Sequence, residues 1–371
     1  MTKARTNASV APAVGRNMII NGAMNVAQRS ASVADVGASV ILPTCDRWII
    51  NPGATAGRVT VTQTADGPNG ISANCLKIDC TTADASIASG EQFILEHKLE
   101  GQNVQRIGKG VVGAKQVTIS FYVKANAIFN FALEFFDADN SRNCSKLFAT
   151  TTDWVRQELT FPADVDDGSS PFDDDNAASV RLFFWLHAGS DFTSGTLQSG
   201  SFANNTNANR AAGIDSILSN TANNFFITGV QMEVGPVATE FEQEEISVTL
   251  KKCYRYFQKI AAASGAVFKR LGFGYTTTNR SGDFLFPLET TLRDVPTIVT
   301  TGTAANYCVY HANTITACDL VPFIDTGSDA GIQNGMFVFN VRVASGLTAG
   351  QGVTCMSNNN TSAFLSLDAE L

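Results

Sequence analysis

The feature that most constrains this chain is the alternation of apolar and polar residues in one segment after another. The segment "KQVTISFYVKA" is the clearest case. The apolar face carries Val117, Ile119, Phe121 and Val123. The opposite, more polar face carries Thr118, Ser120, Tyr122 and Lys124. A period of two, carried by β-branched and aromatic residues, predicts a strand with one buried face.

Similar runs extend over most of the sequence. The next one, "IFNFALEFFD", follows after the short turn "ANA", at a distance that predicts a hairpin with the strand before it. Further runs include "RWII", "GRVTVTQTA", "NCLKIDC", "EQFILEHKLE", "WVRQELTF", "SVRLFFWLHA" and "NNFFITGVQMEV". Strands at this spacing without helical crossovers predict a sandwich or a jelly roll.

One segment departs from this pattern and has helical spacing. Ile246, Leu250, Cys253 and Phe257 recur at i, i+4, i+7 and i+11, with Tyr254 beside them. Acidic residues precede this stripe and basic residues follow it, as the helix dipole favours. Alternating runs resume afterwards, for example in "MFVFNVRVA". The predicted fold is therefore all-β: an N-terminal arm (1–16), a jelly-roll β-sandwich (17–241), a short connecting α-helix (242–262) and a smaller C-terminal β-sandwich (263–371).

Composition excludes several partners. Only 16% of the 371 residues are charged, and the net charge is −8. An acidic chain without clustered Lys and Arg is a poor nucleic-acid binder, and no segment is apolar for long enough to insert into a membrane. The eight cysteines form no C-x-x-C pair and are expected to be free, buried thiols, and the three histidines lie far apart in sequence.

The run "SVRLFFWLHA" predicts a strand with two apolar faces. One face carries Val180, Leu182, Phe184 and Leu186, and the other carries Phe183, Trp185 and His187. Two interpretations of the second face stay open. In the first, a loop or a subunit covers this face; in the second, its flat rings form a platform that stacks on a sugar. Trp48 and Trp154, at the starts of two other strands, are expected to anchor the core.

An acidic loop, "DVDDGSSPFDDDN", is the candidate metal site. Oxygen-rich loops can bind Ca²⁺, which takes six to eight oxygen ligands. The candidate ligands are Asp166, Asp167, Asp173, Asp174 and Asp175. The spacing is not that of an EF-hand, and a solvated polar loop is the alternative. Ca²⁺ is the one cofactor that the sequence suggests.

No catalytic motif stands out. The nucleophile elbow G-x-S-x-G and the phosphate loop are both absent. A glycan-cleaving enzyme needs two carboxylates across a cleft, and Glu134, Asp137 and Asp139 are the nearest candidates, with solvated turn acids as the alternative. The chain is therefore expected not to be an enzyme.

Two segments resemble structural proteins of tailed bacteriophages. "ITGVQMEVGPVATEFE" followed by "CYRYFQK" is similar to a segment shared by tail-fibre-like or virion-associated proteins with a carbohydrate-binding-type jelly roll. The opening "RNMIINGAMNVAQRS" with "CDRWII", and the later "FLFPLETTLRDVPTIVTTG" and "LSLDAEL", are similar as well, so the resemblance spans most of the chain.

The resemblance implies a protein of the virion that assembles in the host cytoplasm as a homo-oligomer, often a trimer, with other virion proteins as partners. The expected function is tail-fibre-like adhesion to host-surface glycans. A capsid or tail decoration protein that stabilises the particle is the first alternative, and a glycan-degrading enzyme is the second. Tyr254 and Phe257 are candidates for a subunit interface, with packing inside the chain as the other reading of the same stripe.

Overall fold

The computed structural model describes residues 15–165, 171–261, 267–324, 331–333 and 335–371. Its contacts divide the chain into two compact units, Met1–Thr249 together with Leu371 (unit 1) and Leu250–Glu370 (unit 2). Almost all regular structure in both units is antiparallel strand, so the all-β prediction is confirmed.

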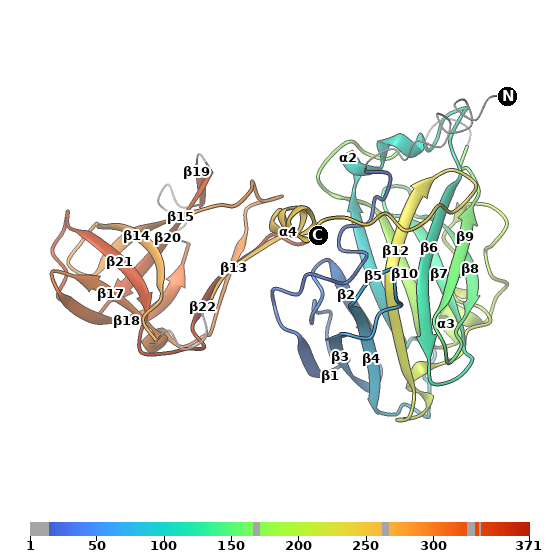
Figure 1. Cartoon of the computed structure of the whole chain (residues 1–371), viewed down its shortest axis with the longest axis horizontal. Coiled ribbons are helices and arrows are strands. Elements are labelled where there is room, and N and C mark those ends of the chain that lie inside the picture. The colour runs from blue at the N-terminus through green and yellow to red at the C-terminus, as the bar shows by residue number, and fades with distance from the viewer. Residues whose placement is uncertain (1–14, 166–170, 262–266, 325–330, 334) are drawn as a thin grey trace. The chain divides into compact units, whose positions relative to one another are not determined.

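Unit 1 contains two six-stranded antiparallel sheets whose strands lie along roughly the same axis (Figure 1). The first sheet has the order β1 (Ser32–Val36), β3 (Arg58–Thr64), β4 (Cys75–Thr82), β12 (Asn224–Val234), β6 (Val117–Ala125) and β9 (Val155–Phe161). The second sheet has the order β11 (Ala203–Asn204), β8 (Arg142–Ala149), β7 (Asn130–Asp137), β10 (Ala178–Ala188), β5 (Gln92–Glu100) and β2 (Trp48–Gly53).

Short helical turns connect some of these strands. They are α2 (Gly101–Val104), η1 (Gln105–Ile107), α3 (Ser190–Thr193), η2 (Asn207–Asn209) and η3 (Ile217–Ser219). Within the described residues no helix is long and apolar enough to span a membrane.

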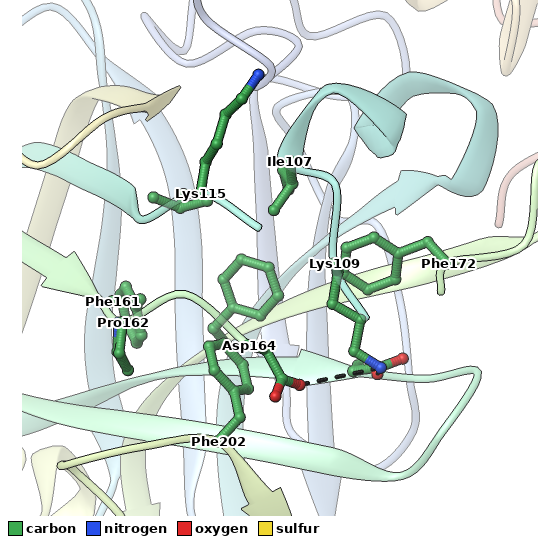
Figure 2. A pocket seen from close by; sticks show the side chains of 11 residues that line it. Ile107, Lys109, Lys115, Phe161, Pro162, Asp164, Phe172 and Phe202 are labelled. Atoms are coloured by element: carbon green, nitrogen blue, oxygen red, sulfur yellow. Dashed lines mark ion pairs between the residues drawn. The ribbon is translucent and has the colours of Figure 1, made fainter. Parts of the chain in front are cut away.

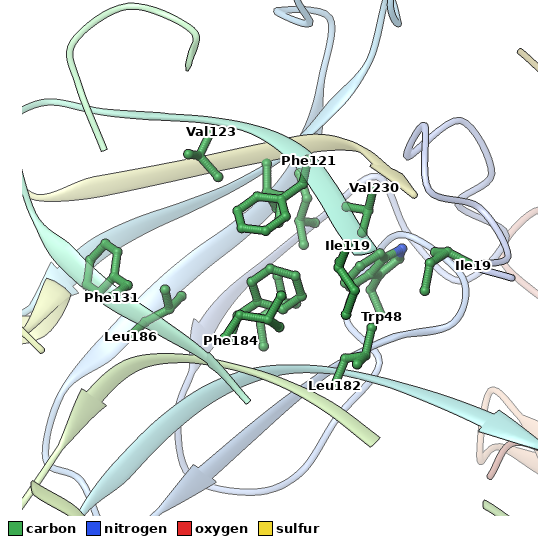
Figure 3. Packing of buried hydrophobic residues seen from close by; sticks show 14 of the residues in the cluster. Ile19, Trp48, Ile119, Phe121, Val123, Phe131, Leu182, Phe184, Leu186 and Val230 are labelled. Atoms are coloured by element: carbon green, nitrogen blue, oxygen red, sulfur yellow. The ribbon is translucent and has the colours of Figure 1, made fainter. Parts of the chain in front are cut away.

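The core of unit 1 lies between the inner faces of the two sheets. Phe121 of the first sheet and Phe184 of the second meet edge to face, with ring centres 5.2 Å apart (Figure 3). Trp48 is 1% exposed, lies 6.1 Å from Phe184 between ring centres, and donates its indole N–H to the carbonyl oxygen of Asn21 at 3.1 Å. Trp48 is thus a core anchor, as predicted.

The predicted hairpin of residues 117–125 and 130–137 is wrong. β6 pairs with β12 and β9 in the first sheet, whereas β7 pairs with β10 and β8 in the second. The connection between them therefore crosses from one sheet to the other. Both strands still bury the apolar faces predicted for them, because these faces meet across the core rather than side by side in one sheet.

The predicted helix is shorter than its stripe suggested. α4 covers Ile246–Tyr254, and the boundary between the units falls within it, after Thr249. Phe257–Ala261 is instead strand β13, paired with β22. Residues 242–245 and 255–261 were therefore wrongly assigned to the helix, and residue 262 lies outside the described residues. The reason is that the position of Phe257 in the sequence fits a helical stripe and a strand equally well. Pairing with β22, which lies far away in the chain, decides in favour of the strand.

Unit 2 contains a three-stranded and a seven-stranded sheet. The smaller has the order β13, β22 (Phe364–Asp368) and β16 (Thr297–Thr300). The larger has the order β15 (Ser281–Pro287), β14 (Arg270–Thr276), β21 (Gly352–Ser357), β17 (Tyr307–His311), β18 (Thr314–Phe323), β20 (Met336–Val343) and β19 (Gly331–Gln333), with η4 (Ala304–Asn306) before β17. β15 also pairs with β20, so six strands of this sheet close into a ring.

All eight cysteines are free and buried, as expected from the sequence. Burial raises the pKa of the Cys75 thiol to about 12 and that of Cys144 to about 11, so these thiols stay protonated near neutral pH.

Candidate functional site

The outer face of the second sheet is closed by a segment of the chain itself. The strand register places Glu96, Phe183 and Glu134 side by side on β5, β10 and β7, with Trp185 in the next row. The segment 189–217, here called the cover segment, packs over this face through Ala211 and, partly buried, Phe192 and Ile214. We call the face beneath it the sealed face.

Polar contacts complete the closure of the sealed face. Trp185 donates its indole N–H to Glu134 Oε2 at 2.8 Å, and Arg210 of the cover segment donates to Glu134 Oε1 at 2.9 Å. The Arg210 guanidinium carbon lies 4.9 Å from the centre of the Trp185 ring and 5.2 Å from that of Phe183. Burial raises the pKa of Glu134, although Arg210 and Trp185 both act against this shift.

The sugar platform predicted on Phe183, Trp185 and His187 is therefore not what the structure presents. These side chains are 3%, 0% and 0% exposed. A ring that is covered by protein on this scale offers no face to a sugar, and the alternative reading, cover by a loop, describes the structure. His187 instead turns to a group of carboxylates, described below.

The outer face of the first sheet is partly exposed around Phe226, where it carries its own aromatic rings. Farther along β6 and β12 this face is buried, with Thr118, Ser120, Gln231 and Glu233 at most 4% exposed. Phe226 on β12 lies between Lys77 of β4 and Lys124 of β6 in the register. Trp154, immediately before β9, meets Phe226 edge to face with 6.3 Å between ring centres. Tyr122 stands one row further along β6, beside Arg156 of β9. We call the surface formed by Tyr122, Trp154, Phe226, Lys77, Lys124 and Arg156 the Trp154 face; each of its residues is partly exposed.

Ammonium groups lie over the rings of this face. Lys124 Nζ is 5.1 Å from the centre of the Trp154 ring and 4.8 Å from that of Phe226, and Lys77 Nζ is 5.7 Å from the centre of Phe226. The attraction of a cation for a ring fixes the orientation of both groups. The rings are therefore held by these contacts, and both stay partly exposed.

Each cation of the Trp154 face is also paired with a carboxylate. Three ion pairs flank the rings: Lys77 with Asp79 at 3.1 Å, Lys124 with Asp66 at 2.8 Å, and Arg156 with Glu158 at 2.9 Å. The surface thus offers both hydrogen-bond donors and acceptors and has no net charge from these pairs. Such a surface suits a polar, uncharged ligand better than an anion.

Trp154 was expected to anchor the core, and this expectation is wrong. The ring lies on the outer face and donates its N–H to the carbonyl oxygen of Asp66 at 3.0 Å. Alternation along β12, which buries Phe225 and turns Phe226 outward, is the sequence signal for this surface. It was missed because the register that brings Trp154 beside Phe226 is not visible in the sequence.

The carboxylates considered for glycan cleavage do not converge. Glu134 and Asp137 are three residues apart on β7 and therefore lie on opposite faces of the sheet. Glu134 is held by Arg210, and Asp137 Oδ2 is 2.6 Å from Lys109 Nζ. Asp137 Oδ1 also accepts the backbone N–H of Asp139. These acids are engaged in structural contacts rather than aligned across a cleft.

A small pocket with a volume of about 10 Å³ lies in unit 1 (Figure 2). Phe161, Phe172 and Phe202 contribute rings to its wall, and Lys109 and Asp164 approach each other across it at 3.9 Å. Lys109 also pairs with Asp137, as described above, and Arg142 pairs with Asp164 at 2.8 Å. The charged side chains in and around the pocket are thus already paired with one another.

The predicted Ca²⁺ ligands are only partly within the described residues. Asp166 and Asp167 lie outside them. Asp173, Asp174 and Asp175 are exposed, and Asp175 Oδ1 accepts the backbone N–H of Ala177 at 2.9 Å. Within the described residues these aspartates do not form a group of converging metal ligands, so the Ca²⁺ site stays a prediction.

The two residues predicted at a subunit interface differ in setting. Phe257 belongs to strand β13 and is 4% exposed, which leaves little of its ring for a neighbouring subunit. Tyr254 ends α4 and is partly exposed. The interface stays a prediction, with Tyr254 as its better candidate.

Comparisons with known proteins found only distant structural likeness. No protein-family model matches the sequence, and no curated protein matches it. Solved structures similar to the chain include carbohydrate-binding modules. One is described as "CBM4 structure and function", with 15% identity, a TM-score of 0.30, and coverage of 58% of this chain and 97% of that one.

Two further structures of this kind are similar to the chain. The family 11 carbohydrate-binding module of Clostridium thermocellum Lic26A-Cel5E shares 12% identity, with a TM-score of 0.27 and coverage of 56% and 98%. TmCBM61 in complex with β-1,4-galactotriose shares 10% identity, with a TM-score of 0.28 and coverage of 59% and 99%. Likeness at this level carries no argument about a ligand, so the chain's own geometry must supply it.

Proposed function

We propose that unit 1 is a glycan-binding β-sandwich and that the Trp154 face is its binding surface. The observation that carries this proposal is the contrast in exposure: Tyr122, Trp154 and Phe226 are partly open, whereas the rings of the sealed face are covered. Indole and phenyl rings on a flat sheet can stack on the apolar face of a pyranose, because both surfaces are planar and poorly hydrated.

The flanking ion pairs supply the polar half of the recognition. Sugar hydroxyls both donate and accept, so they match a surface on which ammonium and carboxylate groups alternate. Lys77 with Asp79 and Lys124 with Asp66 lie on either side of Phe226. Because each cation already has its carboxylate, the proposed ligand is a neutral glycan rather than an acidic one.

The wider role that we propose is tail-fibre-like adhesion by a bacteriophage particle, with the chain assembled as a homo-oligomer. Support for the virion comes from the sequence resemblance at "ITGVQMEVGPVATEFE" and "RNMIINGAMNVAQRS". Locating the chain in an electron-microscopy map of the particle tests this part. Its absence from the particle would overturn the virion role and leave the glycan-binding proposal standing.

The glycan-binding proposal is tested by screening the purified chain on a glycan array and measuring affinity for the best neutral ligand by calorimetry. Trp154→Ala and Phe226→Ala are expected to weaken binding by about tenfold each, which corresponds to about 1.4 kcal/mol. Leu147→Ala is the matched control, because Leu147 is 42% exposed on the other sheet.

Unchanged affinity in both aromatic variants, with Leu147→Ala also unchanged, would rule out the Trp154 face as the binding surface. Failure of the wild-type chain to retain any glycan would count against glycan binding by unit 1 altogether. Shortening of the glycan during the assay would favour the enzyme alternative.

A further inference from the structure

Three buried side chains from separate segments meet at one end of unit 1. Asp84 follows β4, Glu91 precedes β5, and His187 lies near the end of β10. One carboxylate oxygen of each acid and one imidazole nitrogen all lie within 4.8 Å of one another. The three residues are 4%, 7% and 0% exposed. Burial of two acids together is costly unless a cation or hydrogen bonds compensate.

Hydrogen bonds to surrounding groups hold each of the three side chains in place. Asp84 Oδ2 accepts the Thr55 hydroxyl at 2.7 Å and the backbone N–H of Ala56 at 2.9 Å. Glu91 Oε2 accepts the backbone N–H of Ala88 at 3.0 Å. These contacts fix the two carboxylates beside the imidazole.

The imidazole is fixed through one nitrogen and aims the other at the acids. His187 Nδ1 lies 2.7 Å from Ser216 Oγ. His187 Nε2 is buried and has no hydrogen-bond partner among the described residues, and it stands 3.7 Å from Glu91 Oε2. A buried nitrogen without a partner next to two carboxylates is an arrangement that an added cation would satisfy.

The protonation states also suit a metal. Burial lowers the pKa of His187, although Asp84 acts in the opposite direction, so the ring is neutral near pH 7. Burial raises the pKa of Asp84, but the bonds from Thr55, Ala56 and Ser86 outweigh it and the net shift is downward. A neutral imidazole and an ionised carboxylate are the forms in which these groups bind metals.

We propose that Asp84, Glu91 and His187 form a binding site for a divalent transition-metal ion, with Zn²⁺ as the best match. One imidazole nitrogen and carboxylate oxygens suit Zn²⁺, whereas Ca²⁺ takes oxygen ligands alone. Ligand atoms at 2.0–2.1 Å around a tetrahedral Zn²⁺ lie about 3.3 Å apart. The present separations of 3.7 Å for Glu91 and His187, and of up to 4.8 Å within the group, require only small side-chain movements.

The surrounding contacts indicate what the metal does. Ser216, which orients His187, lies in the cover segment, and Asp84 and Glu91 lie next to strands of the two different sheets. A bound ion would therefore join both sheets and the end of the cover segment at one point. Its role is to stabilise the closure of the sealed face, with Ser216 as the residue that orients the ligand.

The site is tested on the full chain, stripped of metal with EDTA and titrated with Zn²⁺ in a calorimeter. One Zn²⁺ per chain is expected, and Zn²⁺ at a hundredfold excess over Kd should raise the Tm by about 5 °C. Glu91→Gln and His187→Gln should each weaken binding at least about tenfold. Glu240→Gln and His311→Gln, an exposed acid and a buried histidine outside the group, should bind as the wild type does.

X-ray absorption of the Zn²⁺-loaded wild type provides a test that needs no variant. Nitrogen and oxygen ligands at about 2.0–2.2 Å support the site, whereas sulfur at about 2.3 Å would assign the ion to cysteines and overturn the proposal. The proposal would also fail if the wild type bound no Zn²⁺ stoichiometrically, if it bound Ca²⁺ in preference, or if both folded variants bound Zn²⁺ like the wild type.

Discussion

The outer faces of the two sheets of unit 1 carry similar residues but differ in how far these residues are exposed. Both present aromatic rings beside arginine or lysine and a carboxylate. On the second sheet these groups are closed under the cover segment, and Trp185 is 0% exposed. On the first sheet Trp154 and Phe226 stay partly open.

The difference shows that an aromatic row on a strand does not by itself indicate a binding surface. The same cation–ring contacts appear in both places, with Arg210 over Trp185 at 4.9 Å and Lys124 over Trp154 at 5.1 Å. What separates them is the cover segment, which follows β10 in the chain and packs back over the outer face of the second sheet. On the sealed face these contacts hold the cover in place, whereas on the Trp154 face they leave the rings available to a ligand.

The largest expected effect is that of Trp185→Ala. Removing this ring creates a cavity beneath the cover segment and leaves Glu134 without one of its donors, so unit 1 should lose about 3–5 kcal/mol of stability. Urea unfolding followed by circular dichroism measures it, with Trp154→Ala as the control on the open face. A loss below about 1 kcal/mol for Trp185→Ala would mean that the sealed face is not closed in solution.

The second-largest effect is expected when the ion pair beneath the cover segment is broken. Arg210→Met leaves Glu134 buried without its cation and should cost about 3 kcal/mol. The double variant Arg210→Met/Glu134→Gln should recover part of this loss, because it removes the uncompensated charge. The same unfolding assay reports both values, and strict additivity of the two single changes would show that the pair is not coupled.

A fall in pH should lower the stability of unit 1 through His97, a buried residue of the second sheet. Burial lowers the pKa of His97 well below its ordinary value of 6.5, so below pH 6.5 the unfolded chain binds a proton that the folded chain does not. This contribution is complete above pH 6.5 and falls by up to about 1.4 kcal/mol per pH unit below it. Unfolding at pH 7 and pH 5 should show a smaller difference in His97→Phe than in the wild type; equal differences would contradict the assignment.

The smallest effect is expected on the open face. Lys124 Nζ and Asp66 Oδ2 are 2.8 Å apart, with side chains 19% and 50% exposed, so solvent screens the pair. Lys124→Met should change stability by less than about 1 kcal/mol. A loss above about 2 kcal/mol in the same assay would show that the Trp154 face is a structural element and not a surface left free for binding.

Much of the fold could be predicted from the sequence, because alternation is a local property. The buried face of residues 117–123 followed from it directly. The core position of Trp48 was expected from its place at the start of a strand, but the same expectation was wrong for Trp154. The hairpin at residues 117–137 and the length of the helix were wrong, because strand pairing depends on partners far away in the chain. Phe257 illustrates this, since it pairs with Asp368 instead of continuing α4.

The candidate sites were less accessible to prediction. The sequence placed His187 on the second face of its strand but did not indicate the carboxylates that face it, because Asp84 and Glu91 lie about a hundred residues before it. It likewise pointed to Phe183 and Trp185 for stacking, although the rings that stay open are Trp154 and Phe226. Convergence of distant segments and coverage by a loop have no local signature.

The sequence by itself determined that the chain folds into strands, which side of most strands is buried and that its cysteines stay reduced, since each of these follows from neighbouring residues and composition. Only the tertiary structure decided which strands share a sheet, which outer face is covered and which three side chains gather around His187. The physical reason is that pairing, burial and ligand geometry depend on contacts between segments separated by tens to hundreds of residues.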